Sequence, residues 1–283
     1  MRHIMVGVDG SPQADRALRW AAAEARLHGA AIELVHGYTV HPHAGMIVHD
    51  LREPAQAALD AVVARNGSVL EGLTCSTRLV PLLWSPADAL ADPAAHTDLV
   101  VVGSRGLGGF AELVLGSTSY RAAAHATVPV AVIRGGDEPL DGRRPLVVGI
   151  DGSPTALRAL RWALAEAGRR GVTLTAVHAY AAPVAWSPAA ATDEQMREHH
   201  ARLHDDAVAL LDRALAAVDV PDGVAVERAV VSGPPAATLL DRAGPQRLLV
   251  VGTAGRGALG RTLLGSVSHQ SLHHTAGPVV VVP

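Results

Sequence analysis

The sequence contains no lysine and a single cysteine, and these two absences exclude several kinds of site. Arginine carries all of the fixed positive charge, so a P-loop lysine and a Schiff-base lysine are both excluded. The single cysteine, Cys75, excludes an internal disulfide and a metal cluster built from several cysteines. We expect Cys75 to be a small buried or half-buried side chain.

Long apolar runs and an excess of positive charge are also missing. Hydrophobic residues make up 49% of the chain, but they occur in short runs, far below the roughly 20 apolar residues of a membrane span. The N-terminal segment reaches Asp9 before the apolar part of a signal peptide could develop. The net charge of -3 lacks the basic excess of a nucleic-acid binder. We therefore expect a cytoplasmic protein with no nucleic-acid partner and no membrane partner.

The chain carries an internal repeat. Its 283 residues suggest two domains, at a prior of roughly 150 residues each. Residues 5–26 reappear at 147–169, and the landmarks Asp9 and Asp151 are 142 positions apart (151 − 9). Such self-similarity indicates two copies of one structural unit.

A glycine-rich stretch is repeated as well. GSRGLGGFAELVLGS begins at Gly103 and GTAGRGALGRTLLGS begins at Gly252, an offset of 149 (252 − 103). The second copy therefore has about seven more residues, which we expect in the loop or helix after Tyr180. Between the copies, residues 136–145 contain turn-forming residues and mixed charges without periodicity, which is typical of a linker. We predict a first domain at 1–135, a linker at 136–145 and a second domain at 146–283.

Strand and helix patterns alternate within each copy. In the first copy HIMVGV predicts a strand, and Ser11-Pro12 supplies the N-cap and first-turn proline of a helix. Further strands are predicted at AIELVH, TCSTRLV, DLVVVG and VPVAVI, and helices at 54–65, at Ser85-Pro86 and at 117–125. The alternation and the continuously apolar strands predict a doubly wound, Rossmann-like α/β domain, with a five-stranded parallel sheet flanked by helices.

The last strand of each copy would be an exposed sheet edge in an isolated domain. These strands, VPVAVI and GPVVVV, are apolar, and exposed apolar edges favour aggregation. Pairing the two copies through these strands would cover both edges. We therefore predict an intramolecular pseudo-dimer, and the sequence leaves open whether whole chains also form a homodimer.

The repeated glycine stretch has the features of an anion-binding loop. It follows an apolar strand, where Gly103 and Gly106 can turn the chain and leave backbone N–H groups uncovered. Gly108 and Gly109 keep the loop thin. Residues 116–119 open a helix whose N-terminus carries a partial positive charge. A phosphate chain is the ligand that this arrangement favours.

The surroundings of the loop exclude two common phosphate motifs. A Walker A loop needs Gly-Lys-Ser/Thr, and the chain has no lysine. Residues 255–260 read GxGxxG, but the dinucleotide fingerprint needs another strand and an acidic residue about 20 positions later. No Asp or Glu follows Asp241. What remains is the spacing G-x2-G-x9-G-S, shared by both copies.

This spacing, together with VGVDGS near the start of the chain and VVGSRG before the loop, resembles the universal stress protein family in its tandem two-domain form. The resemblance covers essentially the whole chain. It implies that the aspartate after the first strand holds the adenosine of ATP and that backbone after the second strand meets adenine. The glycine loop with its Ser/Thr would hold ribose and phosphates. ATP, with or without Mg²⁺, is thus the implied ligand, and the sequence does not distinguish it from AMP or cyclic AMP.

Carried over position by position, the resemblance assigns a set of nucleotide-binding residues. Asp9 and Asp151 take the adenosine role, and the backbones of Gly37 and Ala179 face adenine. The other assigned residues follow the first strand or surround the phosphates: Gly7, Gly103, Arg105, Gly106, Gly108, Gly109, Gly116, Ser117 and Thr118 in the first copy, and Gly149, Gly252, Gly255, Gly257, Gly265, Ser266, Val267 and Ser268 in the second.

The two copies differ at positions near the predicted ligand. Arg105, a candidate phosphate contact, corresponds to Ala254, although the neighbouring Arg256 offers a substitute. Trp84 in the first copy stands where the second has Gly233. We therefore expect the two sites to differ in affinity.

Three classes of function fit such a loop. The resemblance favours an ATP-binding regulatory protein of the stress response that acts on a protein partner not identifiable from sequence. An ATP hydrolase or phosphotransferase would need a positioned base and a carboxylate for a metal, and the loops offer only Glu112 in the first copy and no acid in the second. The third class is a nucleotide-free structural adapter, which the twice-kept spacing disfavours.

Histidines raise the question of a metal site. His200 and His204 stand at i, i+4 on a predicted helix and could meet one ion. No third ligand can be named from sequence, so we expect a solvated helix face and no metal.

Overall fold

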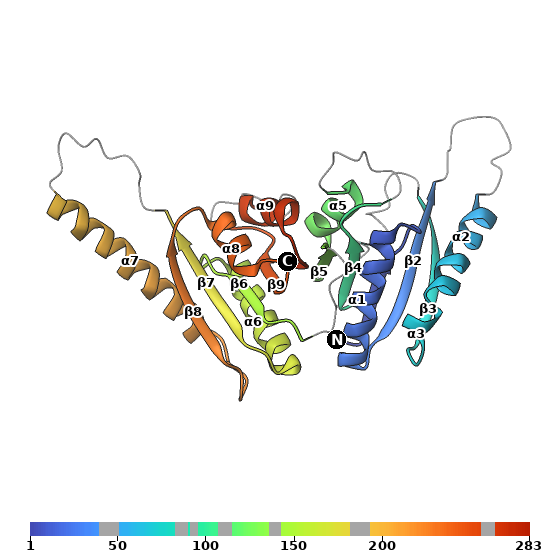
Figure 1. Cartoon of the computed structure of the whole chain (residues 1–283), viewed down its shortest axis with the longest axis horizontal. Helices are drawn as coiled ribbons and strands as arrows, with labels where there is room; N and C mark the ends of the chain where they lie inside the picture. Colours follow the sequence, from blue (N-terminus) through green and yellow to red (C-terminus); the bar gives the residue numbers. More distant parts are fainter. Residues whose placement is uncertain are drawn as a thin grey trace.

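The structure, a computed structural model, describes residues 1–39, 51–82, 90, 96–106, 115–135, 143–181, 193–255 and 264–283. Two halves with the same alternation of strands and helices lie side by side, and both chain termini lie near the middle of the molecule (Figure 1). The first half holds β1 to β5 and the second holds β6 to β10. Within the described residues no helix is both long enough and apolar enough to cross a bilayer.

The first half alternates strands and helices as its sequence predicts. Ser11 caps α1, because its Oγ accepts the N–H of Ala14 at 3.1 Å, and Pro12 occupies the first turn. All five residues of β4 are buried, as expected for a strand covered on both faces. The elements are β1 (His3–Gly7), α1 (Pro12–His28), β2 (Ala31–Thr39), α2 (Arg52–Arg65), α3 (Gly67–Leu70), β3 (Cys75–Leu82), β4 (Leu99–Gly103), α5 (Ser117–His125) and β5 (Val130–Ile133).

The second half repeats this order. Ser153 caps α6 by accepting the N–H of Ala156 at 3.1 Å, as Ser11 does in α1. The elements are β6 (Leu146–Gly149), α6 (Pro154–Arg170), β7 (Leu174–Tyr180), α7 (Asp193–Ala216), β8 (Val226–Ser232), α8 (Pro235–Ala243), β9 (Leu248–Gly252), α9 (Ser266–His274) and β10 (Val279–Val282).

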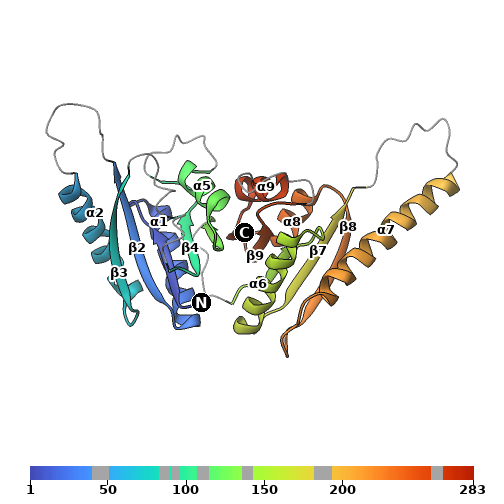
Figure 2. The same cartoon turned by 180° about the vertical axis from the view of Figure 1, so that it is seen from behind.

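One ten-stranded sheet runs through both halves, in the order β3-β2-β1-β4-β5-β10-β9-β6-β7-β8. Pairing is parallel within each half, which confirms the predicted five-stranded parallel sheets. At the centre β5 and β10 pair antiparallel, with Ala131 opposite Val280. The predicted joining of the two last strands is therefore confirmed. Figure 2 shows the same arrangement from behind.

The sheet lies between two layers of helices, each with its own apolar core. One core gathers the buried residues of α1, α2, α3, α6 and α7 on one face of the sheet. The other gathers those of α5, α8 and α9 on the opposite face. Alternate strand residues serve the two cores, as Val101 and Val102 do. Both cores continue across the β5–β10 junction, so the two halves share one interior.

The structure differs from the sequence prediction in the second strand. We predicted that β2 ends at His36, but it continues to Thr39, because β3 is long enough to pair with Tyr38 and Thr39. α3 was not predicted. The predicted helix at Ser85-Pro86 lies outside the described residues except for Leu90, which is helical and buried. Cys75 is half-buried, as expected.

The strand registers locate the extra residues of the second half. Ile32 pairs with Cys75 in the first half, and the equivalent residue Leu174 pairs with Val226 in the second. More chain therefore separates the partners in the second half, and it lies between β7 and β8, after Tyr180, where the repeat analysis placed it. The described part of this connection is the long helix α7.

Candidate functional site: a cavity at the carboxyl ends of β6 and β9

A cavity of about 670 Å³ opens in the second half, where the carboxyl ends of β6 and β9 meet. These strands are neighbours in the sheet although β7 and β8 separate them along the chain, so the cavity lies at the topological switch point where α/β sheets bind ligands. Its volume falls within the roughly 300–1,000 Å³ typical of small-molecule sites. The cavity is lined by nine residues that the sequence analysis assigned to nucleotide binding: Gly149, Asp151, Ala179, Gly252, Gly255, Gly265, Ser266, Val267 and Ser268.

Asp151 lies in the short turn between the end of β6 and the start of α6. Its Oδ1 accepts the N–H of Ser153 at 2.9 Å, and Gly152 between them has φ 79, a left-handed conformation that favours glycine. This turn fixes the carboxylate at the cavity wall. Among the described residues that line the cavity, Asp151 is the one acid.

Two glycines, one at the end of β9 and one in the loop after it, allow backbone to approach other groups closely. A Cβ on Gly252 would lie 2.8 Å from the carbonyl carbon of Thr155, in the first turn of α6. A Cβ on Gly255 would lie 2.8 Å from Asp151 Oδ2. Neither glycine has a positive φ. We predicted that these glycines turn the chain and uncover backbone N–H groups, and the structure adds a further reason for bare backbone here, which is close packing.

Helix α9 points its N-terminus into the cavity. Its N-cap residue, Gly265, offers no side-chain acceptor to the first N–H groups of the helix. The Gly265 N–H itself donates to the carbonyl of Thr253 at 2.7 Å, which closes the glycine loop onto the helix. The first N–H groups of α9, with Ser266 beside them, thus carry the partial positive charge of a helix N-terminus toward the cavity.

Ser268 has a structural contact of its own. Its hydroxyl donates to the carbonyl of Gly252 at 2.5 Å, and the residue is 3% exposed. Ser119, which stands at the same place in the first half, donates to the carbonyl of Gly103 at 2.6 Å. Both serines tie the helix that follows the glycine loop to the strand that precedes it.

The first half repeats this geometry. Asp9 Oδ1 accepts the N–H of Ser11 at 3.0 Å, and a Cβ on Gly106 would collide with Asp9 Oδ2. Gly103 packs against the backbone of Gln13 in α1, where a Cβ would lie at 2.9 Å. The Gly116 N–H donates to the carbonyl of Ser104 at 2.8 Å, and α5 begins there with Ser117 and Thr118. Asp9, the three glycines and the start of α5 are thus arranged as their counterparts are in the second half.

Gly7 and Gly149 have a packing reason for being glycine. A Cβ on Gly149 would lie 2.7 Å from Leu239 Cδ1 in α8, and one on Gly7 would lie 3.1 Å from Leu90 Cδ1. Sequence reasoning assigned both glycines to ligand binding and did not foresee these leucines.

Gly37 and Ala179 lie within strands. Their backbones pair with Val80 and Val231, so the expectation that the chain has left the second strand at these points is wrong. Ala179 nevertheless lines the cavity.

Some assigned positions fall outside the described residues. They are Gly108, Gly109 and Gly257, together with Trp84, Glu112 and Arg256, on which the comparison of the two copies depends. Arg105 is described and is exposed at the end of β4. At the equivalent place in the second half, the carbonyl of Ala254 accepts the hydroxyl of Thr155.

Thr155 is a cavity residue that sequence reasoning missed. It lies in the first turn of α6, and its hydroxyl holds the glycine loop against that helix through Ala254. Apolar side chains of Val177, Leu239 and Val251 form another part of the wall. A hydroxyl in the turn after Asp151 was a readable signal, but the first half has Gln13 there, so the repeat did not draw attention to it.

Three histidines near the carboxyl ends of the strands make contacts within the protein. Nδ1 of His36 and of His178 lies 2.7 Å from the carbonyls of Val8 and Ile150, which links the carboxyl ends of neighbouring strands. The His204 ring meets Tyr180 edge-on, with 6.0 Å between centroids.

The cavity combines a wall of apolar side chains with one carboxylate, exposed backbone and an open helix N-terminus. Such a site suits an elongated ligand that has a flat apolar ring system at one end and an anionic group at the other. Hydroxyls between the two ends would meet the carboxylate of Asp151 or the backbone of the glycine loop.

Comparisons with known proteins agree with this architecture. The model of the universal stress protein family matches residues 1–134 and 142–283. A universal stress protein of Mycolicibacterium smegmatis is 38% identical over 292 residues, covering 99% of this chain and 96% of that protein. One from Mycobacterium tuberculosis is 33% identical over 290 residues, covering 98% and 96%.

Among solved structures, a universal stress protein from Archaeoglobus fulgidus has the same fold over 99% of this chain and 97% of its own, with a TM-score of 0.68 and 18% identity. The chain therefore belongs to the universal stress protein family, with two family domains in tandem.

Proposed function

We propose that the chain is a cytosolic, ATP-binding regulatory protein of the stress response, with one nucleotide site in each of the domains 1–135 and 146–283. The observation that carries this proposal is the cavity of the second domain. Residues far apart in the sequence, selected by the G-x2-G-x9-G-S spacing and the aspartate after the first strand, line one space of about 670 Å³.

The phosphates of ATP belong at the glycine loop. Here the backbone of Gly255 and the first N–H groups of α9 face the cavity, and a helix N-terminus stabilises an anion by roughly 0.3–1 kcal/mol in addition to direct hydrogen bonds. Mg²⁺ bound to the triphosphate would supply further positive charge. In the first domain Arg105 would add a cation, and its replacement by Ala254 supports a difference in affinity between the sites.

The adenosine belongs at the other end of the cavity. Asp151 lines the cavity and is held in place by the Ser153 N–H, and its carboxylate would accept a ribose hydroxyl. Val177, Ala179 and Leu239 offer the apolar wall that an adenine ring needs. Asp9 would act in the same way in the first domain.

Turnover of ATP is not the role that the site favours. Phosphoryl transfer needs a positioned base and usually a carboxylate that holds a metal. Among the described lining residues Asp151 is the one acid, and its place is at the adenosine end. Nucleotide occupancy would therefore act by altering the surface offered to a protein partner. A nucleotide-free adapter and a weak ATP hydrolase are the alternatives.

Titration calorimetry with ATP tests the proposal on wild type, Asp9→Asn and Asp151→Asn, with free phosphate assayed in the same samples. Asn keeps the oxygen that accepts the Ser11 or Ser153 N–H but loses the charge. We expect about two sites per chain and a loss of roughly 10- to 100-fold in affinity at the substituted site, the range for a hydrogen bond to a charged group.

Asp212→Asn is the matched control, because Asp212 pairs with Arg228 on the surface and α7 contributes no residue to the cavity lining. It should bind ATP like wild type. Absence of ATP binding to wild type would favour the adapter, and rapid phosphate release would favour the enzyme.

A further inference from the structure

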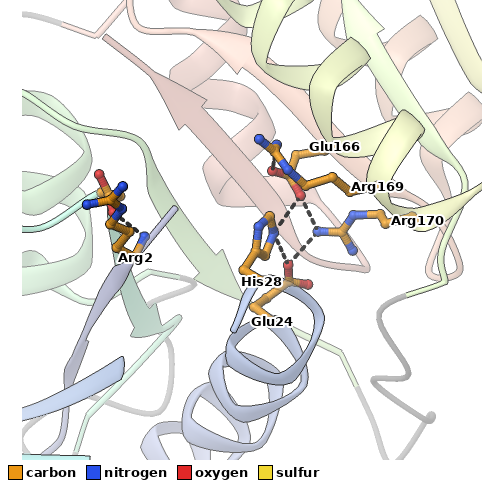
Figure 3. A network of polar contacts seen from close by, with 7 residues as sticks. Arg2, Glu24, His28, Glu166, Arg169 and Arg170 are labelled. Atoms are coloured by element: carbon orange, nitrogen blue, oxygen red, sulfur yellow. Dashed lines mark hydrogen bonds and ion pairs between the residues drawn. The ribbon is translucent and has the colours of Figure 1, made fainter. Parts of the chain in front are cut away.

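A buried cluster of charged side chains joins the two domains at the C-terminal ends of α1 and α6. His28 Nε2 lies 3.1 Å from Glu166 Oε2, and Arg170 Nη2 lies 2.6 Å from Glu24 Oε2, so both contacts cross the domain boundary (Figure 3). The side chains of all four residues are 2% exposed or less. Each helix also pairs internally, His28 with Glu24 at 3.7 Å and Arg170 with Glu166 at 3.2 Å.

The cluster follows the internal repeat. Glu24 and Glu166 occupy equivalent positions of α1 and α6, and so do His28 and Arg170, four residues later in each helix. Each glutamate therefore meets the cation of its own helix and that of the other domain. The repeat is broken in one respect, because one of the two cations is a titratable imidazole and the other is a permanent guanidinium.

The charge of this cluster depends on His28. With His28 protonated, two carboxylates face two buried cations. With His28 neutral, Arg170 is the one fully buried cation left between two carboxylates. Arg169 lies 3.3 Å from Glu166 Oε1, but its side chain is 48% exposed, so water screens much of its charge. Glu24 Oε1 is buried without a hydrogen-bond partner among the described residues, which makes that carboxylate sensitive to the loss of a neighbouring charge.

We propose that His28 is a proton-operated latch between the two domains, which holds α1 against α6 when its imidazole is protonated and weakens that contact when the imidazole is neutral. The inference is independent of nucleotide binding. It assigns a pH-dependent function to a contact that lies at the ends of α1 and α6 opposite to those that begin beside Asp9 and Asp151.

The ionisation of His28 agrees with this geometry. Its hydrogen bonds to Glu166 and Glu24 raise its pKa from 6.5 to about 8, against the effect of burial. Burial alone would raise the pKa of Glu166, but the hydrogen bond to His28 and the charge of Arg170 outweigh it and lower that pKa. The charged groups that face His28 in the described structure are Glu24 from its own helix and Glu166, Arg169 and Arg170 from α6.

The direction of the pH effect follows from the raised pKa. A group that binds its proton more tightly in the folded state stabilises that state fully below its unfolded pKa of about 6.5. The contribution is lost as the pH rises through the folded pKa of about 8. The latch is therefore closed in mildly acidic and neutral solution and opens in alkaline solution.

A metal ion is the competing explanation of the cluster. Ligand atoms of Glu24, His28 and Glu166 lie within 4.8 Å of one another, a spacing that a divalent ion could bridge. However, Arg170 Nη2 already contacts the Oε2 atoms of both glutamates. A guanidinium in this position pairs with both carboxylates and repels a second cation, so the geometry favours an ion-pair cluster over a metal site.

The test compares wild type with His28→Gln by urea unfolding between pH 6 and pH 9. Gln keeps a hydrogen-bonding side chain but carries no proton-dependent charge. We expect the wild-type unfolding equilibrium constant to rise relative to that of His28→Gln by up to about 30-fold over this range, the ratio set by a pKa difference of about 1.5. His125→Gln, the same change at an exposed histidine of α5, should show no such pH-dependent difference.

A constant difference between wild type and His28→Gln at all pH values would overturn the latch. So would a zinc-dependent stabilisation of wild type that His28→Gln lacks, because that result would make the cluster a metal site. If the variant does not fold, the NMR titration of the His28 ring in wild type decides the question. An apparent pKa near 8 supports the latch, and one at or below 6.5 contradicts it.

Discussion

Gly255 and Asp151 approach each other so closely that a Cβ on the glycine would lie 2.8 Å from the carboxylate oxygen Oδ2. The same relationship holds between Gly106 and Asp9 in the first domain. In each domain the glycine loop after one strand is thus packed onto the aspartate after its neighbour. Because the loop and the aspartate are in contact, a substitution in one should shift the position of the other.

Gly255→Ala should weaken ATP binding in the second domain. The new methyl group must displace the Asp151 carboxylate or the loop, and overpacking of this kind typically costs about 1–3 kcal/mol. We expect roughly a 10-fold or larger loss of affinity at one of the two sites, measured by calorimetry. Gly67→Ala is the control, because among the described residues its added Cβ meets nothing within 4 Å beyond its own chain neighbours and helix backbone. Unchanged binding to both sites in Gly255→Ala would contradict the packing argument.

Gly149→Ala should act mainly on stability, through Leu239. An added Cβ would lie 2.7 Å from Leu239 Cδ1, in the part of the core that also forms the cavity wall. We expect a loss of about 1–3 kcal/mol in the free energy of unfolding, measured by urea denaturation. Combining it with Leu239→Ala removes the clash, so the double variant should be less destabilised than the sum of the single variants. Strict additivity would show that the two residues do not interact as described.

Much of the fold could be predicted because local signals and burial agree. The apolar runs at β1 and β4 are buried on both faces, and the Ser-Pro pairs before α1 and α6 form the caps that their sequence indicates. The joining of β5 to β10 followed from the need to cover two apolar edges. Agreement between the two copies made each of these predictions stronger.

The unpredicted features depend on contacts between distant residues. The packing of Leu239 on Gly149 and of Thr155 on Ala254 cannot be read from the neighbours of these residues in the sequence. Glu24 and Arg170 are 146 positions apart, and their pairing requires that α1 and α6 lie side by side. The one readable signal was a glutamate within an Ala-rich helix face in both copies, followed four residues later by His28 or Arg170.

A crystal structure of the chain grown with ATP tests the central claim most directly. The account predicts density for adenosine between Asp151 and the wall formed by Ala179 and Leu239, with phosphates at Gly255 and the N-terminus of α9. An empty cavity at saturating ATP, or nucleotide bound elsewhere on the molecule, would contradict it.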